Sequence, residues 1–276
     1  MSFPRVLISS RDGERAAPAL YRAGYRGASE EDRPEGTVLA AVFDRAESAA
    51  LARELLAAEG IESRLEVAEA PEDPFASFRE SLRPFRVGSF WIEPREASSD
   101  PAEAGLLSLH VPAACAFGTG LHESTRGILR ELDRGGLEGL GVLDAGCGSA
   151  ILAVAAVRKG ARRAVGFDID LEAVFEARRN LRRNGVEAEV RLFAGGAEAL
   201  AGAFDRVLAN MIWEESGPIL PALARLLVPG GCLILSGILD EREEAARAGV
   251  GSAGLDLEAV FADGEWRTLR ARKPTG

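Results

Sequence analysis

The segment Val142–Leu152 constrains this 276-residue chain more than any other feature. An apolar run ends at Asp144, Gly146 and Gly148 follow, and apolar residues resume at Ile151. This order predicts a buried parallel strand, a tight turn and the start of a helix. Glycines in such a turn let a ligand approach the backbone, because no Cβ stands in the way.

A second short strand, Ala164–Asp168, ends in a carboxylate about 20 residues beyond Gly148, the distance at which an acid contacts the ribose of an adenosine-containing cofactor. The dinucleotide pattern requires a third glycine where Ile151 stands, and the chain has no Gly-Lys-Ser/Thr phosphate loop. S-adenosylmethionine has adenine and ribose but no phosphate, so it fits these residues better than NAD or FAD. An NAD-dependent oxidoreductase is the most distant alternative.

Composition excludes several classes of function. The net charge of −10 argues against binding the phosphates of nucleic acid. Cys115, Cys147 and Cys232 are too far apart in sequence for metal-ligand spacing, and their small number suits a reducing compartment. The chain begins without a secretory segment, and no apolar run approaches the about 20 residues of a membrane span. We therefore expect a cytoplasmic monomer with no metal, no membrane contact and no nucleic-acid partner.

The order of predicted elements indicates two domains. Residues 1–70 read as strand, helix, strand, strand, helix, strand, which is a ferredoxin-like α+β arrangement. Residues 71–100 carry four prolines and are expected to form a linker that includes one strand. In residues 101–276, strands alternate with helices of about 10–15 residues, which predicts an α/β fold with a doubly wound sheet of parallel strands. The open edge of such a sheet binds ligands at the carboxyl ends of its strands.

Asn210 ends an apolar strand at this same edge of the predicted sheet. Methyl transfer to an amine needs a neutral nitrogen whose lone pair is aligned with the methyl group. The amide oxygen of Asn210 can accept hydrogens of that nitrogen and so aim the lone pair. The structural alternative is an asparagine that only forms a turn.

A loop before the glycine turn offers further polar groups. Thr119 lies between two glycines, and Ser124 and Thr125 add two hydroxyls that can bind a carboxylate or an amino group. Either of the last two can equally cap the helix that begins near Arg126. His122 is assigned no catalytic role, because a lone histidine is more often a hydrogen-bonded structural residue.

A series of motifs occurs in order along the chain: Phe117-Gly118-Thr119-Gly120-x-His122-x-Ser124-Thr125, the 143–152 turn, Gly166–Asp170, Ala209-Asn210, Pro229–Gly231 and Gly264–Trp266. Together they resemble the PrmA family of bacterial methyltransferases. Members of this family use S-adenosyl-L-methionine to methylate amino groups of ribosomal protein eleven of the large subunit. The resemblance covers essentially the whole chain. It implies a class I S-adenosylmethionine-dependent methyltransferase with a Rossmann-like sheet, preceded by a domain that recognises the ribosomal substrate.

The resemblance also implies roles for particular residues. Asp168 would hold the ribose hydroxyls, and Asn210 would be the catalytic residue that faces the reacting amine. The residues expected to contact the cofactor are Thr119, Thr125, Gly146, Gly148, Asp168 and Asn210.

Three departures from the family pattern bear on activity. Ala150 stands where a third glycine is usual and could crowd the turn, and Ser124 replaces the first of two threonines. The segment Met211–Glu215 is bulkier and more acidic than the usual small apolar run. Our hypothesis is that Glu214 or Glu215 attracts a cationic amine, or that the acceptor differs; a solvated helix start is the alternative. A methyltransferase for lysines of another protein and a catalytically silent cofactor-binding module both stay open.

Overall fold

The computed structural model describes residues 2–34, 36–69, 82–95, 105–112 and 122–275. The chain divides into two compact units, residues 1–77 and 78–276. The smaller unit has one hydrophobic core, whereas the larger unit has a core on each face of its main sheet.

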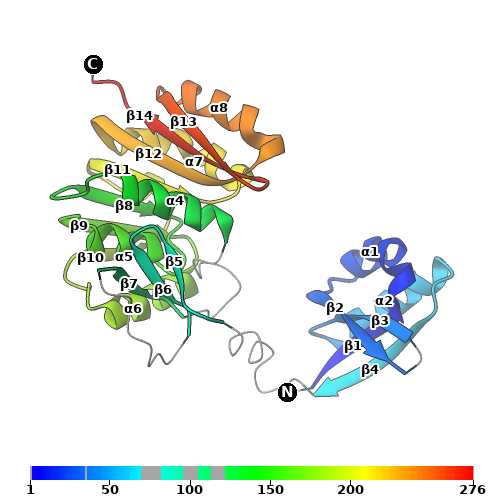
Figure 1. Ribbon diagram of the computed structural model, residues 1–276. Coiled ribbons are helices and arrows are strands. Elements are labelled where there is room, and N and C mark those ends of the chain that lie inside the picture. The colour runs from blue at the N-terminus through cyan, green and yellow to red at the C-terminus, as the bar shows by residue number, and fades with distance from the viewer. Residues whose placement is uncertain (1, 35, 70–81, 96–104, 113–121, 276) are drawn as a thin grey trace. The chain divides into compact units, whose positions relative to one another are not determined.

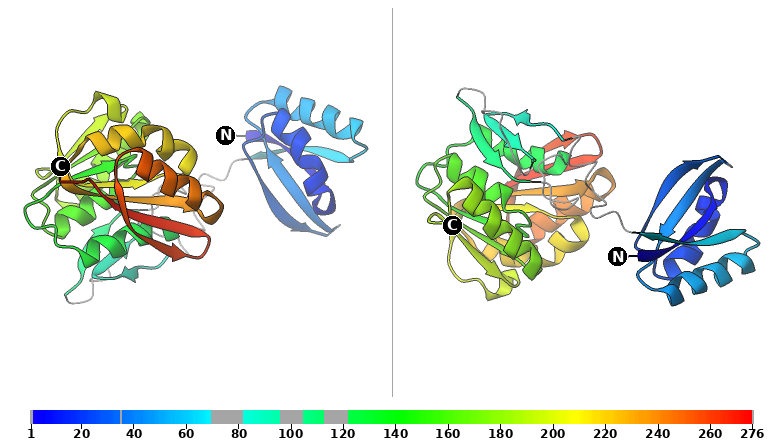
Figure 2. Two further views of the ribbon diagram at one scale, coloured as in Figure 1. Left: turned by 90° about the horizontal axis from the view of Figure 1, so that it is seen from above. Right: turned by 90° about the horizontal axis from the view of Figure 1, so that it is seen from below.

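The smaller unit is the ferredoxin-like α+β fold that the sequence predicted. Its elements are β1 (Ser2–Ser9), a 3-10 turn η1 (Ser10–Asp12), α1 (Gly13–Arg22), β2 (Gly27–Arg33), β3 (Gly36–Val42), α2 (Ala46–Ala58) and β4 (Ser63–Glu69). The antiparallel strands lie in the order β2-β3-β1-β4, and both helices cover the same face of the sheet (Figure 2). Alternation along β1 buries Val6 and Ile8 beneath the helices. On the opposite face Arg5 forms ion pairs with Glu31 and Glu66.

A seven-stranded sheet forms the centre of the larger unit (Figure 1). Its strands are β8 (Gly141–Ala145), β9 (Arg163–Asp168), β10 (Val190–Ala194), β11 (Phe204–Asn210), β12 (Leu227–Leu239), β13 (Asp256–Asp263) and β14 (Trp266–Arg272). They lie in the order β10-β9-β8-β11-β12-β14-β13, and the first five are parallel, as expected. Strand β14 departs from the predicted parallel arrangement: it is antiparallel to both of its neighbours, β12 and β13, so β13 again runs in the direction of the first five strands. Only Gly264 and Glu265 join β13 to β14, and so short a connection permits only an antiparallel hairpin.

Helices cover both faces of this sheet. They are α4 (Glu123–Arg134), α5 (Ile151–Arg158), α6 (Leu171–Asn184), α7 (Trp213–Arg225) and α8 (Glu243–Ser252), with the short turns η2 (Ala197–Ala199) and η3 (Asp240–Arg242). Val142 of β8 packs in the core shared with α4, α5 and α6, whereas the next residue, Leu143, packs in the core shared with α7 and α8. Helix α7 begins at Trp213, three residues after the end of β11. Its early turn is tied by the buried Ser216, whose hydroxyl donates to the carbonyl of Ile212.

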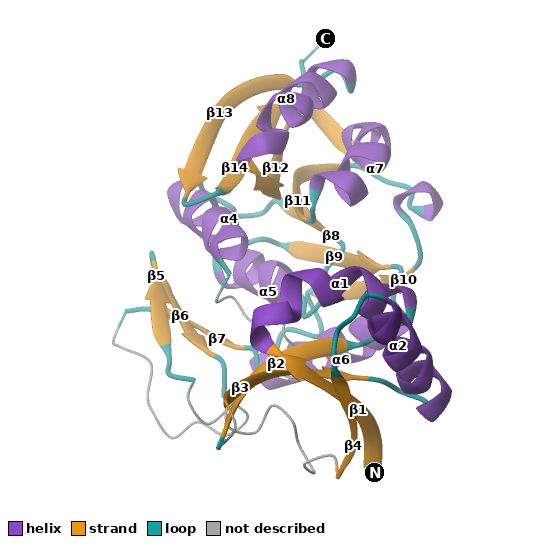
Figure 3. Cartoon of the chain, turned by 90° about the vertical axis from the view of Figure 1, so that its right-hand side faces the viewer, coloured by secondary structure: helices purple, strands orange, loops and turns teal. Residues whose placement is uncertain are grey.

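A three-stranded sheet lies against the helices of the larger unit (Figure 3). It consists of β5 (Phe85–Val87), β6 (Phe90–Glu93) and β7 (Leu107–His110). Phe90 and Ile92 are fully buried in the core that contains α4 and α5. The expected linker, 71–100, is therefore too long, because its second half belongs to the larger unit. The one strand expected there is a hairpin, since Gly88 turns the chain with φ +57°.

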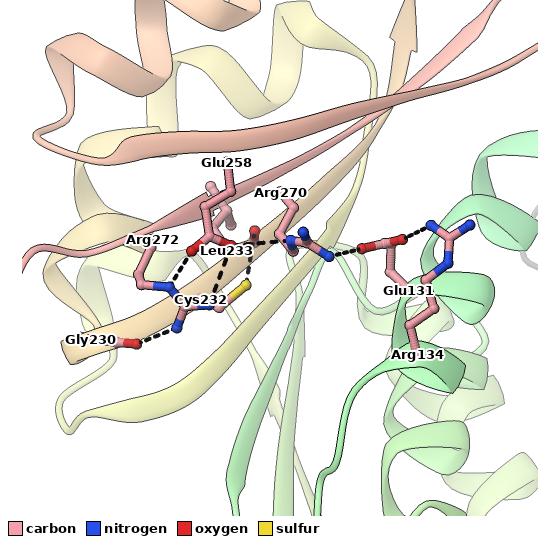
Figure 4. A network of polar contacts seen from close by, with 8 residues as sticks. All are labelled: Glu131, Arg134, Gly230, Cys232, Leu233, Glu258, Arg270 and Arg272. Carbon is pink, nitrogen blue, oxygen red and sulfur yellow. Dashed lines mark hydrogen bonds and ion pairs between the residues drawn. The ribbon is translucent and has the colours of Figure 1, made fainter.

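A polar network fixes α4 to the edge of the main sheet (Figure 4). The side chain of Glu131 is only 2% exposed and accepts hydrogen bonds from Arg134 at 2.5 Å and from Arg270 at 2.9 Å. Arg270 of β14 also donates to Glu258 of β13, which in turn accepts from Arg272. Since a buried carboxylate is tolerated only when it is paired, Glu131 makes the position of α4 depend on β14.

We expect Glu131→Gln to lower the free energy of unfolding of the larger unit by about 2 kcal/mol, because two guanidinium groups lose their buried anionic partner. Urea titration followed by tryptophan fluorescence measures this, since all three tryptophans lie in the larger unit. The control is Glu214→Gln, because the Glu214–Arg242 pair is about half exposed; its expected effect is under about 0.5 kcal/mol. Equal losses in the two variants would contradict this account of Glu131.

Candidate active site

The turn between β8 and α5 exposes bare backbone. Gly146 and Gly148 adopt φ values of +63° and +50°, which favour glycine. The N–H of Cys147 donates to the carbonyl of Phe167 at 2.8 Å, which holds the turn against β9. A Cβ built on Gly148 would meet no protein atom within 4 Å. The turn therefore faces open space on the side where a ligand can approach.

Ala150 completes this turn in a conformation that explains why a glycine is usual there. It has φ 60° and ψ 23°, and among the described residues it is the one non-glycine with positive φ. An alanine in this conformation costs about 1 kcal/mol. Its methyl group is fully buried in the core and does not line the cavity described below. In the described turn, the methyl group of Ala150 therefore does not crowd the site, although the sequence had left that possibility open.

Two buried asparagines on α6 hold neighbouring backbone segments: Asn180 holds the glycine turn, and Asn184 holds β7. The amide of Asn180, fully buried, donates to the carbonyl of Ser149 at 3.0 Å. Asn184, one turn later, donates to the carbonyl of His110 and accepts from its N–H, which joins α6 to β7. We missed both residues in the sequence. Their spacing of four on an apolar helix face was the available signal, since buried amides need fixed partners.

Asp168 lies at the carboxyl end of β9, next to the glycine turn. One carboxylate oxygen accepts the N–H of Gly148 at 2.9 Å, and the other accepts the N–H of Asp170 at 3.0 Å. The side chain is half-buried, and each oxygen keeps a lone pair for a further donor. Gly148 and Asp168, which are both expected to contact the cofactor, are thus joined by a hydrogen bond although they lie 20 positions apart in sequence.

Thr125 and Asn210 form a second bonded pair, although they lie 85 positions apart. The amide nitrogen of Asn210 donates to the hydroxyl oxygen of Thr125 at 2.9 Å. Thr125 is on the first turn of α4 and is 2% exposed, whereas Asn210 ends β11 and is half-buried. This bond fixes which end of the amide faces α4. No donor among the described residues bonds to the amide oxygen, which can therefore accept from a ligand.

A cavity of 440 Å³ lies at this edge of the main sheet. It is lined by His122, Ser124, Thr125, Asp144, Gly146, Cys147, Gly148, Ser149, Ile151, Leu152, Asn210, Met211, Ile212, Glu215, Gly237 and Trp266. The structure therefore brings four of the six expected site residues together: Thr125, Gly146, Gly148 and Asn210. Asp168 does not line the cavity itself but is bonded to Gly148 at its rim. Thr119 lies outside the described residues.

Two buried acidic groups set the electrostatics of the cavity floor. Burial raises the pKa of Asp144 to about 8, and the nearby Asp168 carboxylate adds to this rise although the Ala153 N–H opposes it. Asp144 is therefore mostly protonated at neutral pH. Burial, together with these two acids, also raises the pKa of the Cys147 thiol far above its usual range. Cys147 is thus an unreactive thiol within the glycine turn.

The cap of α4 differs from both capping alternatives that we considered. His122, not Ser124 or Thr125, is the N-cap residue, and its Nδ1 accepts the N–H of Ser124 at 3.3 Å. The Ser124 hydroxyl lies 2.8 Å from the same nitrogen. The His122 ring packs edge-on against Trp266, with the ring centroids 4.6 Å apart. His122 thus has a structural role, and the cap leaves the Thr125 hydroxyl available to Asn210.

Met211 and Gly237 shape the wall that follows Asn210. Gly237 has φ +84°, and a Cβ there would lie 2.7 Å from the carbonyl oxygen of Met211. Only glycine lets β12 pass this backbone so closely. The Met211 N–H donates to the carbonyl of Ser236 at 3.1 Å, which fixes the segment leading from Asn210 into α7.

The fold and this cavity define the class of the protein. A doubly wound sheet whose last strand, β14, is reversed, a glycine turn without a phosphate loop and an acid on the next strand are the features of a class I S-adenosyl-L-methionine-dependent methyltransferase. Comparison with known proteins then gives the family. The family described as "Ribosomal protein L11 methyltransferase (PrmA)" matches residues 14–274. The chain belongs to this family, whose members use S-adenosyl-L-methionine as methyl donor.

Individual relatives agree with this assignment. The chain is 40% identical over 214 residues to the ribosomal protein L11 methyltransferase of Pelobacter propionicus, covering 73% of this chain and 67% of that protein. It is 43% identical over 199 residues to the protein of the same name from Geobacter metallireducens, covering 72% and 65%. The chain thus spans about two thirds of the length of these relatives. A crystal structure of ribosomal protein L11 methylase from Lactobacillus delbrueckii subsp. bulgaricus superimposes with a TM-score of 0.61 at 25% identity, covering 67% of this chain and 94% of that one.

The described residues show neither a metal-binding cluster nor a membrane-spanning helix. No group of three or more histidine, cysteine, aspartate or glutamate side chains is placed to hold a metal ion in the described part of the chain. Among the helices of the same residues, none is long and apolar enough to cross a membrane.

We expect Gly148→Ala to weaken S-adenosyl-L-methionine binding at least about tenfold, because the added methyl group enters space that the ligand needs. Isothermal titration measures the dissociation constant. The matched control is Gly254→Ala: Gly254 also has positive φ (+75°) and an open Cβ position, but it does not line the cavity. Both variants should lose about 1 kcal/mol of stability from backbone strain, and only Gly148→Ala should lose affinity. Unchanged affinity in Gly148→Ala would place the cofactor elsewhere.

The raised pKa of Asp144 predicts a pH dependence of stability. Between about pH 4 and pH 8 the folded chain keeps a proton on Asp144 that the unfolded chain has released, so this group lowers the unfolding free energy as pH rises. The slope from one such group is at most about 1.4 kcal/mol per pH unit and vanishes above pH 8. We expect Asp144→Asn, which cannot ionise, to gain stability relative to the wild type between pH 5.5 and 8 in urea titrations. Parallel pH profiles of the two proteins would contradict it.

Proposed function

We propose that this chain transfers methyl groups from S-adenosyl-L-methionine to lysine side chains and the N-terminal amino group of ribosomal protein eleven of the large subunit. The observation that carries the proposal is the Asn210–Thr125 bond inside the cavity, which orients an amide at the place where an acceptor nitrogen can enter. When bound, the cofactor supplies a methyl group on a sulfonium sulfur. The carbon–sulfur bond breaks as the carbon–nitrogen bond forms, and the nitrogen loses a proton to water.

Asn210 acts in this proposal by aiming the acceptor. Its amide nitrogen is held by Thr125, so the amide oxygen is the end that accepts a hydrogen of the incoming amine. A nitrogen held through its hydrogen points its lone pair in a defined direction, which favours in-line displacement. The catalytic contribution of Asn210 is therefore orientation rather than proton transfer.

The remaining site residues bind the cofactor in this proposal. Gly146 and Gly148 pass beneath its methionine and sugar portions, and Asp168 accepts from the ribose hydroxyls with the lone pairs that the turn leaves free. We propose a cofactor contact for Thr119 from the sequence alone, because it lies outside the described residues. The apolar walls formed by Ile151 and Leu152 exclude water from the reacting atoms.

An amine substrate has to lose its proton before it can react. A lysine side chain has an unperturbed pKa of about 10.4, so only a small fraction is neutral near pH 7. Transfer from water into a cavity with apolar walls lowers that pKa, because burial disfavours the charged form. The rate should therefore rise with pH through the neutral range.

The smaller unit supplies recognition of the protein substrate in this proposal. Its sequence has no pair of glycines one residue apart like Gly146 and Gly148, and its described residues hold no metal cluster, which suits binding rather than chemistry. The net charge of −10 makes a basic partner more favourable than nucleic acid. We further propose that the protein is a cytoplasmic monomer that meets its substrate before or after ribosome assembly.

The proposal is tested by incubating unmodified ribosomal protein eleven with the enzyme and S-adenosyl-L-methionine, followed by intact-mass and peptide mass spectrometry. Mass gains in whole methyl steps on lysines and on the N-terminus support it. Cofactor binding without mass gain, when other lysine-rich ribosomal proteins are modified, would assign another acceptor. Binding without any methylation would leave a silent cofactor-binding module.

We expect Asn210→Ala to lower kcat about a hundredfold while the dissociation constant of the cofactor changes little, because orientation of the amine is lost. Thr125→Val should lower kcat less, since the amide remains but loses its anchor. The control is Thr268→Val: Thr268 is a buried threonine whose hydroxyl bonds to Ser236 outside the cavity lining. Steady-state kinetics with the protein substrate decide this, and a loss in Thr268→Val equal to that in Thr125→Val would refute the specific role of the Asn210–Thr125 bond.

A further inference from the structure

Two adjacent glutamates begin α7, and the structure gives them different surroundings. Glu214 forms an ion pair with Arg242 at 2.8 Å and does not line the cavity. Glu215 lines the cavity, and within the described part of the chain no cation pairs with its exposed carboxylate. We therefore restrict the hypothesis that a glutamate attracts the amine to Glu215.

Glu215 lies near the place where the acceptor amine is proposed to enter the cavity. It lies five residues after Asn210, and the intervening Met211 and Ile212 also line the cavity. The Glu215 N–H donates to the carbonyl of Ile212 at 3.1 Å, which fixes the backbone of this first turn. The helix dipole stabilises a carboxylate here, but it does so equally for Glu214. The helix start alone therefore does not explain why one of the two faces the cavity without a partner.

We propose that Glu215 is a specificity-determining residue that binds the cationic, protonated form of the acceptor amine at the cavity mouth. This inference rests on the proposed methylation of amino groups. A carboxylate next to apolar walls attracts an ammonium more strongly than it would in open water. It is not the base of the reaction, because a carboxylate is a far weaker base than an alkylamine. The amine gives its proton to water as it moves from Glu215 to Asn210.

This role predicts that loss of the carboxylate raises KM without lowering kcat. Glu215→Gln should raise the KM for the protein substrate about three- to fivefold, the range expected for one exposed charge pair. It should leave kcat unchanged or higher, because a neighbouring carboxylate stabilises the protonated amine and its removal favours the reactive neutral form. The rising limb of the pH–rate profile should accordingly move to lower pH. Glu214→Gln is the matched control and should change neither constant.

The experiment measures KM, kcat and the cofactor dissociation constant for wild type, Glu215→Gln and Glu214→Gln. A higher KM confined to Glu215→Gln supports the inference. Three outcomes overturn it: equal effects in both variants, no effect in either, or a loss of cofactor affinity in Glu215→Gln. The last would assign the carboxylate to the amino group of the cofactor instead.

A binding measurement separates this inference from the proposed substrate. If ribosomal protein eleven is not methylated, a short lysine peptide and its acetyl-lysine counterpart are titrated into the enzyme loaded with S-adenosylhomocysteine. Wild type should prefer the lysine peptide, and Glu215→Gln should lose that preference while Glu214→Gln keeps it. The absence of any preference in wild type would overturn the role of Glu215 whatever the natural substrate is.

Discussion

The hydrogen bond from the Gly148 N–H to the Asp168 carboxylate is the contact on which the site depends. It joins the turn after β8 to the end of β9 at 2.9 Å. From the other side, Asn180 of α6 holds the carbonyl of Ser149. A glycine turn would otherwise sample many conformations, because glycine has the fewest backbone restrictions. These two bonds select one conformation, and Ala150 is held in its left-handed geometry as a consequence.

Helix α4 is tied to the main sheet by two polar contacts. At its first turn Thr125 anchors Asn210 of β11, and toward its end Glu131 is paired with Arg270 of β14. A helix is stiff, so the pairing of Glu131 with β14 also helps to set the position of the Thr125 hydroxyl. Both contacts matter because they are buried. As whole residues, Thr125 is 2% exposed and Glu131 is 5% exposed, and an unpaired polar group at such a depth is costly. The stability of the larger unit and the orientation of the Asn210 amide are thus linked through α4.

The charges around the cavity are arranged by depth. At its floor Asp144 is buried and, with its pKa raised to about 8, mostly neutral, while burial keeps the Cys147 thiol protonated. At the rim Asp168 and Glu215 retain contact with water. Anionic groups at the rim attract cations from solution. The proposed passage of an amine from Glu215 to Asn210 follows this gradient from solvent to apolar surroundings.

The order of most elements, the ferredoxin-like unit, the glycine turn and the location of Asp168 and Asn210 at strand ends could be predicted from the amino-acid sequence. These features depend on periodicity, glycine spacing and strand ends, which consecutive residues specify. Four further features emerged from the folded structure: Thr125 bonds to Asn210, Asn180 supports the turn, β5 and β6 belong to the larger unit, and Glu215 rather than Glu214 faces the cavity. Each of these depends on which surfaces meet after the sheet and helices have packed, and residues far apart in sequence carry no local mark of that meeting.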